Sequence, residues 1–513
     1  MPKANHLKRY ARESQGSLIK LYRLKQFFTH EGYDLLRCVH FSRILFAQFK
    51  KKYYLCSRNC ELMTPTHQYI MKKVLFIIIC VCALCACANK AETKHISWAY
   101  DATIYELNTR QFTPEGTFAA AEAELPKLKE LGVDIIWVMP IQPIGVITRK
   151  GTLGSYYSIS DYCAFNPEFG TREDFEHFLA TAHRLGMHVI LDWVANHTAP
   201  DSKWTQNEGW HYRDSLGNLM IQYDWTDISK LNYDNPDMRA EMLKSMRWWV
   251  DSIGIDGFRC DVAAEIPTDF WNWAYEDIRK DHPQLFALAE AESPENKLCD
   301  QAFDMYYGWN LHHLMNMVAQ QKSTVDNLWD YFARAEKDFP PYAIRMNFTS
   351  NHDENSWNGT EFERMGDATD AMAVFTYIIP GMPLIYTGQE YANNHRLEFF
   401  EKDCIDRNED AHQFAMYQRL NKLRKDNPAL WSEEKGAPML RIPADNDKIF
   451  AAARPTKDNT VLAFFNFSPE EQTVTLQTAD YQGSYSCLCG KQVEVGEQLQ
   501  LTLKPWAYKV LTK

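Results

Sequence analysis

The sequence predicts an α/β protein: a (β/α)8 barrel with a short insertion after its third strand, followed by a C-terminal all-β sandwich domain. Three observations support this. Eight apolar strands alternate with amphipathic helices between residues 97 and 430, the pattern of repeated βα units. Acidic and other polar residues stand at the ends of several of these strands. After about residue 430, short strands follow one another without helices.

The eight predicted strands are short apolar runs, as expected where both faces of a strand are buried. They cover residues 103–108, 133–140, 188–193, 255–263, 285–290, 302–305, 343–348 and 382–386. Helices are predicted at 118–131, 171–186, 236–253, 268–280, 309–320, 368–379 and 410–425. We expect Gly132 to end the first helix and Thr171 to cap the second, with Asp174 three residues on.

The predicted sandwich domain covers residues 431–513 and the barrel residues 97–430. Within the sandwich, strands are predicted at 449–454, 460–467, 472–476 and 498–503, with turn residues between them. The insertion in the barrel is predicted at about 197–235.

The N-terminal part of the chain differs from the rest. Its first 70 residues are rich in Lys and Arg, and Met71-Lys72-Lys73 then precedes a short apolar run that ends at Cys87. A positive start before a short apolar run is typical of a signal peptide, here residues 71–87. Residues 84–87 resemble a bacterial lipoprotein cleavage box, which predicts a lipid on Cys87 and a tether at 88–96; an ordinary membrane anchor is the alternative. We expect translation to start at Met71 and residues 1–70 to be an upstream extension.

Composition narrows the classes of partner. The net charge of −12 argues against nucleic acid, and the aromatic content of 13% suits either a large core or sugar rings. The six cysteines after Cys87 are Cys163, Cys260, Cys299, Cys404, Cys487 and Cys489. They show no zinc-ligand spacing, and no structural disulfide is predicted.

The strand that ends at Asp261 places a cation and a carboxylate on one face. Arg259 and Asp261 are two residues apart, and side chains at i and i+2 of a strand share a face. Since a guanidinium is always charged, we expect it to lower the pKa of Asp261 and to keep this carboxylate ionised. Such a carboxylate can act as a nucleophile. A surface ion pair is the other interpretation of the pair taken alone.

Polar residues at the other strand ends favour the interpretation of Asp261 as a nucleophile over a surface ion pair. In a barrel of this kind the carboxyl ends of the strands converge on one site. The residues at these ends are Asp192, Asn196, His197, Arg259, Asp261, Glu290, Asn351, His352 and Asp353. A single acid at a strand end is usually a helix cap or a surface residue, but several acids, an Arg and two His at matching ends indicate a catalytic site.

Two carboxylates of this kind suit hydrolysis of a glycosidic bond. One carboxylate attacks the anomeric carbon, and the other, protonated, gives its proton to the leaving oxygen. Asp261 beside Arg259 suits the first role. Glu290 lies between alanines, a setting that raises a carboxyl pKa and suits the second. Asp353 would accept hydrogen bonds from sugar hydroxyls, and His197 and His352 would donate to them.

These segments resemble the signature regions of the α-amylase family of glycoside hydrolases. Residues 192–197, 257–261, 289–291 and 348–353 resemble the four regions in order, and 138–141, 230–232 and 381–390 are further matches. The resemblance covers about residues 97–513. It implies a TIM barrel with Asp261 as nucleophile, Glu290 as acid/base and Asp353 as transition-state stabiliser. Glu292, two residues after Glu290, stays an alternative acid/base.

The resemblance also implies binding residues. Tyr157 would stack on the sugar at the cleavage point, with Asp192, His197, Arg259 and His352 as further substrate contacts. Many family members bind calcium near the equivalent of Asn196. The insertion here is short and shows no carboxylate cluster, so no cofactor is expected to be required, and calcium at Asn196 stays open.

The resulting prediction is a retaining glycosidase that acts on starch-derived glucans or maltooligosaccharides at the bacterial cell envelope, anchored to the membrane through Cys87. A transglycosylase that uses the same residues on α-glucans is the first alternative. An inactive glycan-binding barrel is the second, and it would be expected to lack at least one of Asp261, Glu290 and Asp353. Retention predicts a separation of about 5 to 5.5 Å between the Asp261 and Glu290 carboxyl groups.

Overall fold

The computed structural model describes residue 96, residues 98–432 and residues 435–513. The described chain lies within one compact unit, Thr93–Lys513. The predicted upstream extension, the signal peptide, Cys87 and all of the tether except Ile96 lie outside the described residues. The boundary between barrel and sandwich at residue 430 stays a prediction, because both parts belong to that one unit.

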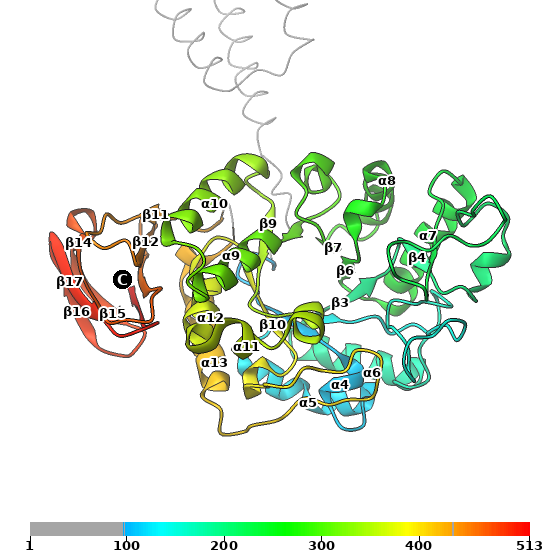
Figure 1. The fold of residues 1–513 in the computed structure, drawn as a ribbon, viewed down its shortest axis with the longest axis horizontal. Helices are drawn as coiled ribbons and strands as arrows, with labels where there is room; N and C mark the ends of the chain where they lie inside the picture. Colours follow the sequence, from blue (N-terminus) through cyan, green and yellow to red (C-terminus); the bar gives the residue numbers. More distant parts are fainter. Residues whose placement is uncertain (1–95, 97, 433–434) are drawn as a thin grey trace, which may run out of the picture. The chain divides into compact units, whose positions relative to one another are not determined.

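Eight parallel strands close into a barrel, which confirms the predicted fold class (Figure 1). The order around the barrel is β1-β10-β9-β8-β7-β6-β3-β2. The strands are β1 (Ile104–Leu107), β2 (Ile135–Val138), β3 (His188–Trp193), β6 (Gly257–Cys260), β7 (Phe286–Ala289), β8 (Met305–Tyr307), β9 (Ile344–Asn347) and β10 (Met382–Tyr386). Nearly every strand residue is buried, because the barrel interior covers one face and the helices cover the other.

Helices surround these strands. They are α4 (Thr109–Phe112), α5 (Phe118–Leu131), α6 (Arg172–Arg184), α7 (Pro236–Trp248), α8 (Thr268–Arg279), α9 (Trp309–Ala319), α10 (Val325–Asp338), α11 (Glu361–Met365), α12 (Thr369–Ile378) and α13 (His412–Asp426). Two predicted helix ends are confirmed. Gly132 terminates α5 in the left-handed region at φ 96°, and Thr171 and Asp174 form a capping box on α6.

Some elements differ from the prediction. The strand expected at 302–305 is β8, which starts at Met305, because the Asp304 carboxylate accepts from the backbone of Ala287 and anchors the turn before it. The helix expected at 236–253 leaves α-geometry at Trp249 and continues as a π-helix, Trp249–Ile253. Helix α10 had not been predicted as a separate element. Its buried residues, such as Leu328, Tyr331 and Ala335, follow a helical spacing that was available in the sequence.

The insertion and the C-terminal part are built from antiparallel strands. In the insertion, β4 (His197–Thr198) pairs with β5 (Ser229–Lys230). The C-terminal strands are β11 (Leu440–Arg441), β12 (Ile449–Pro455), β13 (Thr460–Asn466), β14 (Gln472–Gln477), β15 (Gly483–Cys487), β16 (Gln492–Val495), β17 (Gln498–Leu503) and β18 (Tyr508–Thr512). They form a six-stranded sheet, β11-β12-β13-β18-β15-β16, and a two-stranded sheet, β14-β17.

The C-terminal sheets pack against the barrel helices. Phe375 of α12 lies edge-on to Phe450, Phe465 and Phe467 at centroid distances of 4.9, 5.4 and 5.2 Å. In Figure 1 these strands, orange to red, lie beside α10 and α12. Such aromatic contacts in one continuous core make the two parts a single packed body. Among the described residues, no helix has the length and apolar character needed to cross a membrane.

Candidate active site

Arg259 of β6 is the centre of a buried charge cluster. Its Nη1 donates to Asp192 Oδ1 at 2.8 Å and to Asp261 Oδ1 at 3.1 Å. Its Nη2 lies 2.8 Å from Glu290 Oε2. Since β3 and β7 flank β6 in the barrel, carboxylates from three adjacent strand ends meet one guanidinium. The structure therefore brings together residues that the sequence places up to 98 positions apart, between Asp192 and Glu290.

Aromatic side chains surround the same guanidinium. Arg259 Nε donates to the Tyr307 hydroxyl at 3.1 Å. The guanidinium carbon lies 5.0 Å from the ring of Trp137 and 5.8 Å from that of Tyr157. Arg259 has no exposed surface. With water excluded, each of its ion pairs is stronger than it would be at the surface.

The pKa of Asp261 is shifted in the direction opposite to the sequence-based prediction. Burial and the Glu290 carboxylate raise the pKa of Asp261 well above its usual value, and Arg259 offsets only part of this. Burial also raises the pKa of Glu290, as predicted, again against the effect of Arg259. The spacing of Arg259 and Asp261 predicted that these two residues pair. It could not show that the Asp192 and Glu290 carboxylates also contact Arg259. Protonation of one of the two carboxyl groups would relieve this excess of negative charge.

Glu290 and Glu292 occupy different surroundings. Glu290 Oε2 accepts from the backbone N–H of Val262 at 2.8 Å, and Val262 takes a left-handed φ of 37°, which is strained for a β-branched residue. Glu292 instead accepts from the Tyr331 hydroxyl and from the backbone of Asn310, at the start of α9. Only Glu290 of the two contacts the Arg259 cluster, so the geometry favours it as the acid/base.

A second cluster adjoins Asp192. The Tyr157 hydroxyl donates to Asp192 Oδ2 at 3.0 Å and lies 2.8 Å from His352 Nε2. The rings of Tyr157 and His352 stack at 5.4 Å. His352 Nε2 also lies 3.4 Å from Asp353 Oδ2, and its Nδ1 2.5 Å from Glu106 Oε1. Burial works against a charged imidazole, but Asp353 and Glu106 raise the pKa of His352 to about 9. His352 is therefore a cation at neutral pH.

Asp353 is the most exposed of the three predicted catalytic carboxylates. Its side chain is 36% exposed, against 10% for Asp261 and 13% for Glu290. An accessible carboxylate beside a charged His352 can accept hydrogen bonds from hydroxyl groups of a bound sugar. The Asp353 carboxylate also raises the pKa of Asp261 and of Glu290, so the three predicted catalytic carboxylates lie in one cluster.

Comparisons with known proteins show the family of this chain. The family profile "Alpha amylase, catalytic domain" matches residues 100–209 and 205–467. An α-amylase of Haloarcula japonica is 30% identical over 401 residues, which cover 74% of this chain and 57% of that protein. This chain belongs to the α-amylase family.

Solved structures of the family share its fold. An α-amylase from Lactobacillus plantarum is 29% identical, with a TM-score of 0.72 over 80% of this chain and 99% of that one. A maltogenic α-amylase from Thermotoga neapolitana is 27% identical, with a TM-score of 0.73 over 80% of this chain and 98% of that one. A maltosyltransferase of Salinibacter ruber that uses α-1,4-glucan and maltose 1-phosphate is 25% identical over 72% of this chain and 59% of its own length. This chain spans about three fifths of the length of several of its curated relatives.

Asn196, where calcium was left open in the prediction, is hydrogen-bonded to neighbouring side chains. Its side-chain Nδ2 donates to Gln222 Oε1 at 2.7 Å and lies 3.2 Å from His197 Nδ1. In the described part of the chain, no group of three or more His, Cys, Asp or Glu side chains could hold a metal ion. Calcium also binds amide and backbone carbonyl oxygens, so calcium at Asn196 stays a prediction.

His197 is the neighbour of Asn196 in the sequence and contacts its side chain. It is 2% exposed, and burial lowers the pKa of His197 to about 4, so it is neutral at pH 7. Its Nε2 is buried without a hydrogen-bond partner. The contact between His197 and substrate stays a prediction.

Two residues of the cluster were not singled out from the sequence. Glu106, at the end of β1, is fully buried and pairs with His352. Tyr307, at the end of β8, accepts from Arg259. Both follow the rule that found Asp192 and Asp261, a polar group at the carboxyl end of a barrel strand, and applying it to every strand would have found them.

The cysteines take no part in the cluster. The six described cysteines are all free. Cys260 stands between Arg259 and Asp261, but its Sγ lies 3.3 Å from the Tyr275 hydroxyl on α8. It thus faces the helices outside the barrel, as the alternation along a strand requires.

Proposed function

We propose that this chain is a retaining glycoside hydrolase that cleaves α-glucosidic bonds in starch-derived glucans or maltooligosaccharides. The observation that carries the proposal is the meeting of Asp261 and Glu290 on one buried guanidinium. A retaining mechanism needs one ionised and one protonated carboxyl group at the same bond. The excess of carboxylates around Arg259 favours that state.

In the first step the Glu290 carboxyl group gives its proton to the glycosidic oxygen, and an Asp261 oxygen attacks the anomeric carbon. The bond to the leaving sugar breaks and a glycosyl ester forms on Asp261. Arg259 keeps the attacking carboxylate in place. Asp353 and the charged His352 hold the hydroxyl groups of the ring under attack.

In the second step Glu290, now a carboxylate, accepts a proton from water. The resulting hydroxyl attacks the anomeric carbon, the ester bond breaks, and Asp261 returns to a free carboxylate. Two inversions give net retention of the anomeric configuration. Glu290 ends protonated and ready for another cycle.

Product analysis tests this proposal. The parent is incubated with maltoheptaose and with pullulan, beside Asp261→Asn. Short maltooligosaccharides from the parent and none from the variant are expected, and panose or maltotriose from pullulan would identify the linkage that is cut. Products from Asp261→Asn at the parent's rate would overturn the assignment of the nucleophile.

The same residues support a transglycosylase as the second candidate. Relatives of this chain include maltosyltransferases that use α-1,4-glucan and maltose 1-phosphate. The two activities differ in whether water or a sugar hydroxyl resolves the ester on Asp261. Products longer than the substrate, formed from maltoheptaose without another acceptor, would favour transfer, whereas a steady release of reducing ends would favour hydrolysis.

We also propose that the chain is lipid-anchored at the bacterial cell envelope. The support is the apolar run after Met71 and the cleavage box that ends at Cys87. Expression in a bacterial host with a radioactive fatty acid should label the parent and leave Cys87→Ser unlabelled. An unlabelled parent would contradict the anchor without affecting the catalytic proposal.

A further inference from the structure

Two cysteines lie on one hairpin turn of the C-terminal six-stranded sheet. Cys487 is the last residue of β15, and Cys489 lies in the turn that leads to β16. Neither residue belongs to the catalytic cluster or has a role in the proposed function. Cys487 is 9% exposed, whereas Cys489 is an exposed residue. The turn therefore holds one accessible thiol and one buried thiol, two residues apart.

Backbone hydrogen bonds fix the turn that carries the two thiols. The Gly490 N–H donates to the Cys487 oxygen, and the Cys487 N–H donates to the Lys491 oxygen, both at 2.7 Å. Between them, the Leu488 N–H donates to the oxygen of Val510 on the neighbouring strand β18 at 2.9 Å. A turn closed in this way keeps its first and last Cα atoms within about 7 Å, so the two cysteines are close before any reaction takes place.

The two cysteines also interact directly. The backbone N–H of Cys489 donates to Cys487 Sγ at 3.3 Å. A hydrogen bond with the Cys487 thiol, and another with the backbone of Lys491, lower the pKa of the Cys489 thiol. Burial raises the pKa of the Cys487 thiol, and its hydrogen bond with Cys489 adds to this effect. The exposed sulfur therefore ionises first, and the buried S–H group donates to it.

Other cysteines of the described chain differ from Cys489. Cys163 is also exposed, but burial of its thiol raises its pKa, and the Asp161 carboxylate adds to this effect. Cys260 is fully buried, and burial raises the pKa of its thiol well above the usual value. The thiolate, and not the thiol, is the nucleophile in cysteine chemistry. Cys489 is therefore better suited to nucleophilic attack than Cys163 or Cys260.

The turn is open to an approaching molecule. Strand β16 stands at one end of the strand order of the six-stranded sheet, next to β15. A methyl group at Gly490 would meet no heavy atom of the described residues within 4 Å. The Lys491 ammonium next to it also favours a thiolate at Cys489. A small molecule can therefore reach the Cys489 sulfur from solvent.

A bridge between these cysteines would close a loop of only three residues. Since the stabilisation from a disulfide grows with the length of the loop that it closes, such a bridge would add little to the stability of the fold. Strained or exposed disulfides are also the ones that are easily reduced. The pair is therefore suited to reversible exchange and not to a structural bridge.

We propose that Cys487 and Cys489 form a dithiol site that exchanges with small organic disulfides. The Cys489 thiolate attacks one sulfur of a disulfide RSSR, the S–S bond breaks, and the departing thiolate takes up a proton and leaves as RSH. The Cys487 thiolate then attacks the Cys489 sulfur of the mixed disulfide, which releases a second RSH and leaves the two cysteines bridged. Two protein thiols are oxidised and one external disulfide is reduced. This inference is independent of the proposed function.

Thiol exchange on the full chain tests the site. The reduced protein is incubated with oxidised glutathione, free thiols are blocked with N-ethylmaleimide at successive times, and the mass of the tryptic peptide 458–491 is measured. This peptide holds Cys487 and Cys489 and no other cysteine. We expect the peptide to become two hydrogens lighter and unreactive to maleimide. This change should be about tenfold faster than the modification of Cys163, because a lower pKa gives more thiolate.

Single variants separate the two roles. Cys487→Ser should hold one glutathionyl group on Cys489, because no second thiol resolves the mixed disulfide. Cys489→Ser should leave Cys487 unmodified, because its sulfur is buried. Cys163→Ser is the matched control, and its peptide 458–491 should react as in the parent. A parent peptide that stays reduced, or one that holds glutathione on Cys489 as stably as Cys487→Ser does, would overturn the proposal.

Discussion

Two regions of the active site differ in burial and chemistry: the floor, which is Arg259 with Asp192, Asp261 and Glu290, and the groove at the rim, which is lined by residues 356–357 and 396–401 and contains Trp357. On the floor, Arg259 is fully buried and meets three carboxylates at strand ends. At the rim, Trp357 is more than half exposed and stands on loops. Electrostatic effects dominate where water is excluded, whereas stacking on an exposed ring adds modest affinity. Changes on the floor should therefore affect the chemistry and the fold, and changes at the rim should affect only the length of substrate preferred.

The largest effect is expected from Asp261→Asn. An amide cannot form the glycosyl ester, so kcat on maltoheptaose should fall by about 10⁴-fold, a loss of the size seen when a catalytic group is removed. Steady-state kinetics measure this. The control is Asp234→Asn, an exposed aspartate of the insertion, which should keep the parent's rate. A loss below tenfold in Asp261→Asn would contradict its role.

Glu290→Gln should lower kcat by about 10² to 10⁴-fold, the usual contribution of a general acid or base. An aryl glycoside whose leaving group needs no proton should still form the ester, and added azide should then release the sugar. Because burial raises the pKa of Glu290, its proton is lost only above the ordinary carboxyl range, and the parent's rate should fall there as the pH rises. Glu292→Gln is the matched control and should keep both the rate and the pH profile.

Arg259→Met should act on stability as well as on catalysis. It leaves the carboxylates of Asp192, Asp261 and Glu290 buried without their cation, which costs about 3 to 5 kcal/mol of unfolding free energy. Urea unfolding at pH 7 and pH 5 measures the cost. The loss should shrink at the lower pH, because protonation removes the uncompensated charge. A loss that is the same at both pH values would contradict the electrostatic origin.

His352 should make stability depend on pH on the alkaline side. Its pKa is about 9 in the folded protein and about 6.5 when unfolded, so the folded state binds the proton more tightly. This stabilisation is complete below about pH 6.5 and is lost as the pH rises through 9; its upper limit is about 3 kcal/mol at about 1.36 kcal/mol per pKa unit. Urea unfolding from pH 6.5 to 9.5 should show the fall in the parent and not in His352→Gln.

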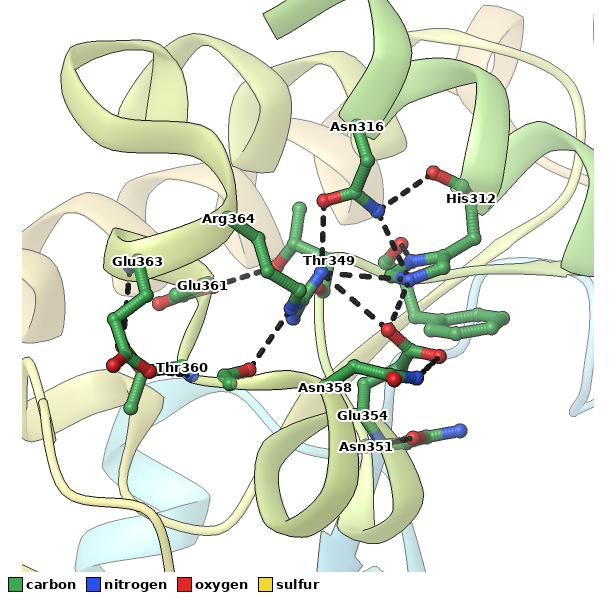
Figure 2. Close-up of polar contacts among 12 residues, drawn as sticks. His312, Asn316, Thr349, Asn351, Glu354, Asn358, Thr360, Glu361, Glu363 and Arg364 are labelled. Carbon is green, nitrogen blue, oxygen red and sulfur yellow. Dashed lines mark hydrogen bonds and ion pairs between the residues drawn. The ribbon is translucent and has the colours of Figure 1, made fainter. Parts of the chain in front are cut away.

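The smallest effect is expected from Glu354→Gln, which acts on the rim through the π-helix Glu354–Asn358. The neutral amide keeps the shape but loses the negative charge that pairs with Arg364 and accepts from His312 (Figure 2). KM for maltoheptaose should rise about threefold, with a smaller change for maltotriose, because a looser turn presents Trp357 less well. Glu336→Gln, on the exposed face of α10, is the control. An equal change for both substrates would indicate a general loss of structure.

The residues of the floor could be predicted from the sequence, because the apolar periodicity of the strands and the positions of their carboxyl ends identify them. A buried parallel strand has an apolar run, and the polar residue after that run lies at the shared end of the barrel, which located Asp261 and Glu290. The pKa of Asp261 was predicted in the wrong direction because the spacing along one strand showed only Arg259. The competing carboxylates come from other strands, and their distances depend on barrel closure.

The contacts between the loops of the rim could not be predicted from the sequence. Residues 354–358 and 395–401 are joined by hydrogen bonds between loops, and loops have no periodic signal from which a contact could be predicted. The C-terminal strands β11, β15, β16 and β18 were also missed. Glycine and serine in β15, and the polar Lys509 and Thr512 beside the two buried residues of β18, weaken the alternation that marks a strand.

Trapping the glycosyl enzyme would test the central claim most directly. Glu290→Gln is incubated with a fluorinated α-glucosyl fluoride, whose fluorine leaves without a proton, and the intact and peptide masses are then measured. The account predicts an added mass of one glycosyl group on the peptide that contains Asp261, and none in the Asp261→Asn/Glu290→Gln double variant. A label on Asp353, on Glu292 or on any other residue would contradict the nucleophile assigned here and the roles built around Arg259.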